Sequence, residues 1–127
     1  MMPKLHFENY ISLETLRKNN QSVRTPVWFV IDNDLLYVIT REKTGKVKRI
    51  KNNPNVKIAP CTFTGKIIGN WISGTAKRVY GGEFKKAIEL RKKKYGFKAK
   101  IAELVSRGKG DLIVFSIKLE SDDLFKK

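Results

Sequence analysis

The pattern of apolar and polar positions predicts a chain built mainly of short β-strands. Residues 10–17 alternate imperfectly and fit a strand or a helix, but the turn-forming residues 19–22 that follow favour a strand ending in a hairpin. Other segments are rich in β-branched and aromatic residues and are bounded by turn signals such as Asn33-Asp34. The five further predicted strands are residues 27–31, 35–39, 55–62, 66–80 and 111–119.

Three segments change from the strand period to a helical one. In residues 44–52, the apolar Val47 and Ile50 are three apart, Thr44 can cap the first turn, and Pro54 prevents continuation. The other two predicted helices, which carry apolar side chains at helical spacing, are residues 82–95 and 99–106.

Six antiparallel strands with helical insertions fit a closed or half-open barrel, because closure leaves no exposed sheet edge. Gly69 and Gly74 stand where a bulge or bend would curve the longest predicted strand. A chain of 127 residues can bury one core, and no linker or repeat interrupts it. We therefore predict one mainly β domain, a six-stranded antiparallel split β-barrel, spanning residues 1–127.

Composition narrows the classes of function. No apolar run approaches the ~20 residues that span a bilayer, and residues 1–8 lack the features of a secretion signal, so we expect a cytoplasmic protein with no membrane partner. Cys61 is the only cysteine and His6 the only histidine. This excludes an intrachain disulfide and a cysteine-based zinc cluster and gives no support to a hydrolytic triad. We expect no metal site, and the sequence identifies no catalytic residue.

The net charge of +15, from 27 Lys and Arg against 12 Asp and Glu, favours an anionic partner. A field of that sign attracts nucleic acid, acidic membranes or phosphorylated small molecules equally well. A lysine-rich surface can also serve solubility alone.

Residues 40–50 are the most informative segment, because they lead from a predicted strand into a basic helix. Unpaired N–H groups and the helix dipole favour a phosphate at residues 44–46, where Gly45 permits close approach. Lys46 and Arg49 are three residues apart and share a helix face, and Arg49 can bind two phosphate oxygens at once. From spacing alone, a solvated lysine-rich helix remains an equal alternative.

Several motifs follow one another in the order typical of a known family. They are Tyr10-Ile11-Ser12-Leu13, Thr25-Pro26-Val27-Trp28-Phe29, Leu36-Tyr37-Val38-Ile39-Thr40, Gly45-Lys46-Val47-Lys48-Arg49-Ile50, Asn53-Pro54 and Ala59-Pro60-Cys61. Over residues 10–80 the chain resembles the pyridoxamine-phosphate-oxidase-like, FMN-binding split-barrel family, in particular its deazaflavin-dependent branch. The resemblance implies a homodimer with the cofactor between the subunits and its phosphate held after the third strand.

The resemblance also assigns roles to residues of this chain. The ring system would lie against Pro26, Val27 and Trp28, and Pro60 and Cys61 would lie near it. The residues that would hold the phosphate are Thr40, Thr44, Gly45, Lys46 and Arg49. For Cys61 a small buried strand residue is the more common role, and Trp28 and Trp71 can equally be packing residues. The chain is much shorter than the pyridoxamine-phosphate oxidases proper and lacks a C-terminal substrate segment, so we do not expect vitamin B6 oxidation.

The function implied is hydride transfer between FMN or coenzyme F-420 and a small organic substrate, with the cofactor supplying the chemistry. A basic groove suits the deazaflavin, which is more anionic than FMN. One alternative is a basic β-barrel that grips single-stranded nucleic acid. It is less favoured because the basic residues cluster in the predicted helices, at residues 43–51 and 91–94. Another is a non-catalytic flavin or haem carrier on the same fold, with His6 as the available histidine.

Overall fold

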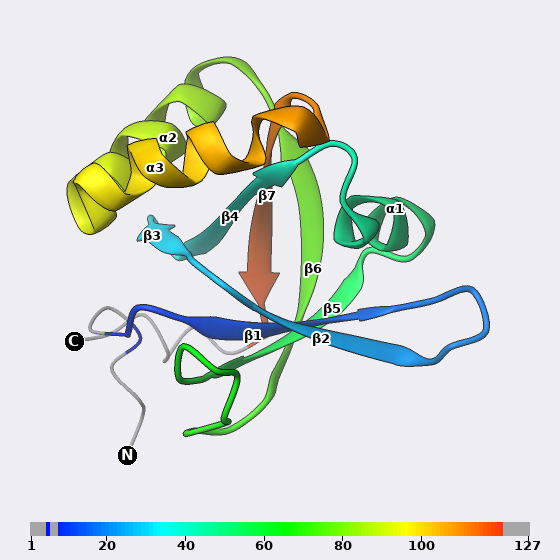
Figure 1. The fold of residues 1–127 in the computed structure, drawn as a ribbon. Helices are drawn as coiled ribbons and strands as arrows, with labels where there is room; N and C mark the ends of the chain where they lie inside the picture. Colours follow the sequence, from blue (N-terminus) through cyan, green and yellow to red (C-terminus); the bar gives the residue numbers. More distant parts are fainter. Residues whose placement is uncertain (1–4, 6–7, 121–127) are drawn as a thin grey trace.

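The computed structural model describes residue 5 and residues 8–120, which form one antiparallel sheet accompanied by helices (Figure 1). The strands are β1 (Ile11–Leu16), β2 (Ser22–Val27), β3 (Val30–Asp32), β4 (Leu35–Arg41), β5 (Asn55–Pro60), β6 (Ile72–Val79) and β7 (Leu112–Leu119). The helices are α1 (Gly45–Asn52), α2 (Gly81–Tyr95), α3 (Phe97–Ser106) and the short 3-10 helix η2 (Arg107–Lys109). His6 lies outside the described residues.

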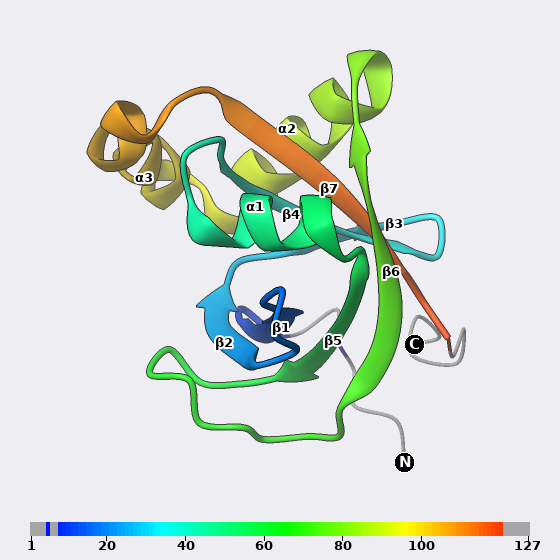
Figure 2. The same cartoon turned by 90° about the vertical axis from the view of Figure 1, so that its right-hand side faces the viewer.

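The sheet has the strand order β2-β1-β5-β6-β7-β4-β3, with every neighbouring pair antiparallel. Its two end strands, β2 and β3, follow each other in the chain and are joined only by Trp28 and Phe29. The sheet must therefore curl until its ends meet at these two residues (Figure 2). The result is a barrel-like sheet that is split between β2 and β3, because no backbone ladder joins these two strands.

The mainly β, antiparallel architecture is confirmed, but the predicted number of strands is wrong. The predicted strand 27–31 is in fact the end of β2 and the start of β3, so the described residues contain seven strands. At Trp28 the chain stops pairing with β1 and then begins to pair with β4. The local sequence pattern carries no information about which strand a segment pairs with. Pro26 is compatible with β2 because β2 is an edge strand, where a missing N–H breaks no ladder.

The predicted strand 66–80 is also too long. Strand β6 begins only at Ile72, and residues 61–71 form a loop in which a single bridge joins Cys61 to Ile67. Gly74 lies within β6 where the neighbouring strand passes very close. A Cβ at this position would stand 2.9 Å from both the Lys118 carbonyl oxygen and the Ile117 Cγ2 atom, so only glycine fits the crossing.

The main core lies inside the curled sheet. Its fully buried side chains include Leu13, Leu36, Ile58, Ile113 and Ile117. Helix α1 adds the buried Ile50 and the partly buried Val47, so the predicted apolar ridge of this helix is confirmed.

A second apolar cluster lies on the outer face of the sheet, beneath α2. It joins Tyr37 and Val114 of the sheet to Ala87 of α2, with α3 packed alongside α2 (Figure 1). Strand β7 is therefore buried on both faces, which explains why five consecutive residues, 113–117, are buried.

No helix in the described part of the chain combines the length and apolar character needed to cross a membrane.

Tyr95, the last residue of α2, holds the link between the two end strands in place. Its ring stacks on Trp28, with centroids 4.2 Å apart and planes 9° from parallel. Its hydroxyl accepts the Phe29 N–H at 3.1 Å and donates to the carbonyl of Asn9 at 2.7 Å or of Phe29 at 3.1 Å. Lys94 also donates to the Phe29 carbonyl at 3.0 Å, and burial lowers its pKa to about 8. The helix thus satisfies backbone groups that leave the ladder where the sheet splits.

We expect Tyr95→Phe to lower the free energy of unfolding by about 1–3 kcal/mol, because it leaves the buried Phe29 N–H without a partner while keeping the stacked ring. Urea denaturation measures this value. Tyr80→Phe is the matched control, since Tyr80 is 67% exposed, and we expect a change within about 0.5 kcal/mol. Equal effects of the two substitutions would show that the Tyr95 hydroxyl does not stabilise the link.

Candidate functional site

A groove of about 290 Å³ lies where the split in the sheet meets the start of α1. Its walls come from the end of β2, from β4, from the first turn of α1, and from α2, α3 and the segment before β7. The lining residues are Val27, Trp28, Ile39, Thr40, Arg41, Thr44, Lys46, Arg91, Ala102, Ser106, Lys109 and Leu112. Five of them, Val27, Trp28, Thr40, Thr44 and Lys46, were predicted from the sequence as cofactor-binding residues.

The start of α1 presents free backbone donors to this groove. Thr44 occupies the N-cap position, as predicted, but its side chain makes no capping hydrogen bond. Its hydroxyl instead donates to the Arg41 carbonyl at 2.9 Å and lies 3.2 Å from the hydroxyl of Thr40. The first N–H groups of α1 are therefore left for an external acceptor, at the end of the helix whose dipole favours an anion.

Lys46 contributes a cation from the first turn of α1. Burial lowers its pKa, and the nearby positive charges of Arg49 and Lys109 lower it further. A partly buried ammonium group next to like charges is unfavourable until an anion approaches it. The local electrostatics therefore favour a negatively charged ligand at this end of the groove.

Arg49 belongs to the last turn of α1, and its guanidinium group reaches back to Gly45, but it is not among the residues that line the groove. Its Nε donates to the Thr15 hydroxyl at 2.6 Å. A Cβ at position 45 would stand 2.6 Å from the Arg49 Nη1 atom, so Gly45 makes room for this guanidinium group. That Gly45 also permits close approach of a ligand stays a prediction.

Arg91 of α2 is a further cation that the sequence analysis did not assign to the site. It is 6% exposed and pairs with Glu103, its Nη2 lying 2.5 Å from the Oε1 atom. Its Nε is buried and has no hydrogen-bond partner among the described residues. A buried donor without a partner is costly. Arg91 also lines the groove, so its guanidinium group adds positive charge there. The one signal in the sequence is that this arginine interrupts the apolar stripe of a predicted helix.

Arg41 lines the groove but serves the framework. Its guanidinium donates to the Ser106 hydroxyl and to the carbonyls of Glu103 and Gly110, at 2.9–3.0 Å. These bonds tie the end of α3 to the end of β4. Arg41 thereby holds the wall that carries Lys109 and Ser106 against the wall that carries Thr40.

Part of the lining of the groove is apolar and aromatic. Trp28 lines it with its indole fixed against Tyr95, beside Val27, Ile39 and Leu112. No carboxylate lines any part of the groove in the described chain. A lining that combines cations with an aromatic surface suits a ligand that carries both a charged group and a ring.

The remaining predicted residues do not line the groove. Pro26 is exposed and packs near Gly65, while the buried Pro60 packs against Gly69. Cys61 is 3% exposed, and burial raises the pKa of its thiol. It therefore occupies the position of a small buried residue, the common role weighed for it above.

Two further predicted features concern Trp71 and metal binding. Trp71 lies under the Arg24 guanidinium, 4.4 Å from it, and does not line the groove. Within residue 5 and residues 8–120, no three His, Cys, Asp or Glu side chains are grouped so that they could hold a metal ion.

Solved structures of similar fold include proteins that bind flavin or haem. The haem storage protein HutZ from Vibrio cholerae has a TM-score of 0.68 and 14% identity, covering 91% of this chain and 84% of its own. A FAD-binding protein from Mesorhizobium loti has a TM-score of 0.62 and 14% identity, covering 93% and 84%. A haem-binding protein from Mycobacterium smegmatis has a TM-score of 0.67 and 13% identity, covering 96% and 56%. At these identities the likeness shows the fold alone.

Comparison by sequence agrees with the fold. None of the curated proteins is similar enough in sequence to match the chain. The sequence model of the family described as pyridoxamine 5'-phosphate oxidase matches residues 4–121, which is nearly the whole chain. The split antiparallel sheet, the groove beside α1 and this match together show that the chain belongs to the pyridoxamine 5'-phosphate oxidase family.

Proposed function

We propose that this protein is an oxidoreductase that holds FMN or the deazaflavin coenzyme F-420 in the groove beside α1 and transfers hydride between it and a small organic substrate. The observation that carries the proposal is that one groove joins Lys46 and the uncapped start of α1 to the stacked indole of Trp28, with the cation of Arg91 also in its lining. Family membership supports a flavin-like ligand, since a FAD-binding protein shares the fold.

The residues present fit such a cofactor. Thr40, Thr44, Lys46 and the free N–H groups of α1 would hold the phosphate, because they combine hydroxyl, ammonium and backbone donors around one point. Val27 and Trp28 would lie against the ring. When bound, the cofactor supplies the hydride chemistry, and the protein supplies binding, orientation and electrostatics.

The number of cations bears on which cofactor is held. Arg91 and Lys109 line the groove in addition to Lys46. One phosphate monoester would satisfy Lys46 and the start of α1, leaving Arg91 for a further negative group. This arrangement favours the more anionic deazaflavin over FMN. The substrate would approach the face of the ring that the protein leaves open.

A non-catalytic carrier of flavin or haem is the second candidate, because two proteins of similar fold are described as haem-storing or haem-binding. The described residues that line the groove include no histidine, cysteine, methionine or tyrosine, so they offer no side chain commonly used as an axial haem ligand. This favours the flavin over haem for the groove.

We further propose a homodimer with the cofactor between the subunits. Four apolar side chains of α3 follow one helix face and are strongly exposed: Phe97 at 74%, Ile101 at 47%, Leu104 at 61% and Val105 at 83%. An exposed apolar face of this kind is typical of an interface. The same helix lines the groove through Ala102 and Ser106, so a partner seated on α3 would lie beside the cofactor.

Parallel titrations of the purified protein with FMN, F-420, haem and a single-stranded oligonucleotide separate the candidates. We expect saturable quenching of flavin or deazaflavin fluorescence, tighter for F-420, without a haem Soret shift. Haem binding alone would favour the carrier. Oligonucleotide binding that weakens steeply with salt would favour the nucleic-acid alternative. Oxidation of reduced cofactor by candidate acceptors, measured by absorbance, then tests for turnover.

Lys46→Ala tests the site itself. Loss of a charge-assisted contact of about 1.5–3 kcal/mol should weaken cofactor binding about ten- to a hundredfold. Lys48→Ala is the control, because it removes the same charge from the other side of α1 and Lys48 does not line the groove. Equal effects of the two substitutions would show that only the general positive field matters and would place the phosphate elsewhere.

Light scattering across a range of protein concentrations tests the dimer. We expect a dimer, and we expect Leu104→Ser with Val105→Ser to weaken it about tenfold or more, because truncating apolar anchors in an interface often costs over 1 kcal/mol each. The control is Lys92→Ser with Lys93→Ser, two exposed positions of α2. A monomer at every concentration would refute the dimer, and an unaffected dimer would refute the α3 interface.

A further inference from the structure

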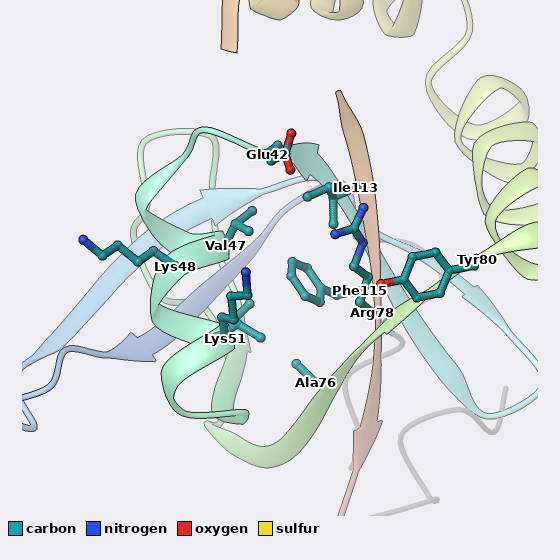
Figure 3. Close-up of a pocket in the computed structure, with 10 residues that line it drawn as sticks. Glu42, Val47, Lys48, Lys51, Ala76, Arg78, Tyr80, Ile113 and Phe115 are labelled. Carbon is teal, nitrogen blue, oxygen red and sulfur yellow. The ribbon is translucent and has the colours of Figure 1, made fainter. Parts of the chain in front are cut away.

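A second and larger hollow, of about 440 Å³, lies on the other side of α1 (Figure 3). Its lining residues are Glu42, Val47, Lys48, Ile50, Lys51, Ala76, Arg78, Tyr80, Ile113 and Phe115. None of them lines the groove described above. Its volume is within the range of about 300–1,000 Å³ that is typical of small-molecule sites.

The geometry of α1 explains why two separate hollows form. Successive residues of a helix are turned by about 100°, so Val47 and Ile50 make one apolar ridge that enters the core. Lys46 lies on one flank of this ridge, facing the cofactor groove. Lys48 and Lys51 are three residues apart on the opposite flank, facing the second hollow. One short helix therefore places basic groups over two sites.

The floor of the second hollow is apolar. Ile50 of α1, Ala76 of β6, and Ile113 and Phe115 of β7 all belong to the main core and also line the hollow. Figure 3 shows Val47, Ala76, Ile113 and Phe115 between α1 and the two strands. The hollow thus extends down to side chains of the core, which favours a ligand with an apolar body.

The rim of the hollow is basic. Lys48 and Lys51 stand on the α1 side and Arg78 on the β6 side, and none of the three forms an ion pair with another described residue. The ring of Tyr80, 67% exposed, lies against Arg78, with the guanidinium carbon 4.9 Å from the ring centroid. Glu42 is the one carboxylate in the lining and stands at the end away from Ala76 (Figure 3).

We propose that this hollow binds a small organic anion with an apolar body, placing the body between α1 and strands β6 and β7 and the charge among Lys48, Lys51 and Arg78. Unpaired cations around an apolar floor complement such a molecule in both charge and polarity. This site is separate from the cofactor groove, so the proposal stands whether or not the groove binds a flavin.

The test uses 8-anilinonaphthalene-1-sulfonate as the anionic probe and N-phenyl-1-naphthylamine, which lacks the sulfonate, as its neutral counterpart. Binding to the full chain is followed by fluorescence and by amide shifts in NMR spectra. We expect the anion to bind more tightly than the neutral probe and to shift the amides of residues 47–51, 76–80 and 113–115. Shifts confined to α3 or to the cofactor groove, or equal affinity of the two probes, would overturn the proposal.

Matched charge variants complete the test. Lys51→Ala with Arg78→Ala should weaken binding of the anionic probe about three- to tenfold, as expected for two partly exposed cations. Lys57→Ala with Lys77→Ala removes the same charge from exposed strand positions outside the hollow, and should change the affinity less than about twofold. Lys46→Ala should also leave it unchanged. Equal losses of probe affinity in the two double variants would refute the site. Amide shifts that change with the protein concentration and not with the probe concentration would also refute it.

Discussion

The two-residue link between β2 and β3 is the constraint on which the rest of the structure depends. A flat sheet would place the first and last strands of the order β2-β1-β5-β6-β7-β4-β3 far apart, yet only Trp28 and Phe29 separate them in the chain. The sheet must curl, and the link cannot itself continue the ladder. Tyr95 and Lys94 supply the missing partners for Phe29 from α2. Helix α2, which follows β6, therefore helps to close the sheet, because its last residues bond to the link between β2 and β3.

The same split creates the candidate site. Where β2 and β3 part, the indole of Trp28 is held against Tyr95 and lines a groove that the start of α1 also borders. An aromatic surface and a helix N-terminus thus face the same groove. Trp28 also has a structural role there, because it stacks on Tyr95. The contacts that close the sheet also hold the indole of Trp28 in place. It stacks on Tyr95, and the Tyr95 hydroxyl bonds to the backbone of Phe29, the next residue of the link.

Both the groove and the second hollow contain cations that acidic residues of the protein do not fully neutralise. In the groove, burial and neighbouring cations lower the pKa of Lys46, and Arg91 keeps a donor without a partner despite its ion pair with Glu103. In the second hollow, the cations of α1 and β6 surround an apolar floor. Buried or crowded cations weaken the folded state unless an anion compensates them. Part of the net charge of +15 therefore lies where a bound anion would neutralise it.

The sequence by itself determined the features that depend on neighbouring residues. The apolar pair Val47 and Ile50, followed by Pro54, was enough to predict α1 and its buried ridge, and five of the residues that line the groove were named from the sequence. Only the tertiary structure decided the rest. Arg91 and Lys109 reach the groove from distant segments, the strand predicted at residues 27–31 divides because its two halves have different partners, and Cys61 does not line the groove. The physical reason is that periodicity records which face of an element is buried, whereas a site depends on which elements meet, and that is settled by long-range pairing and packing.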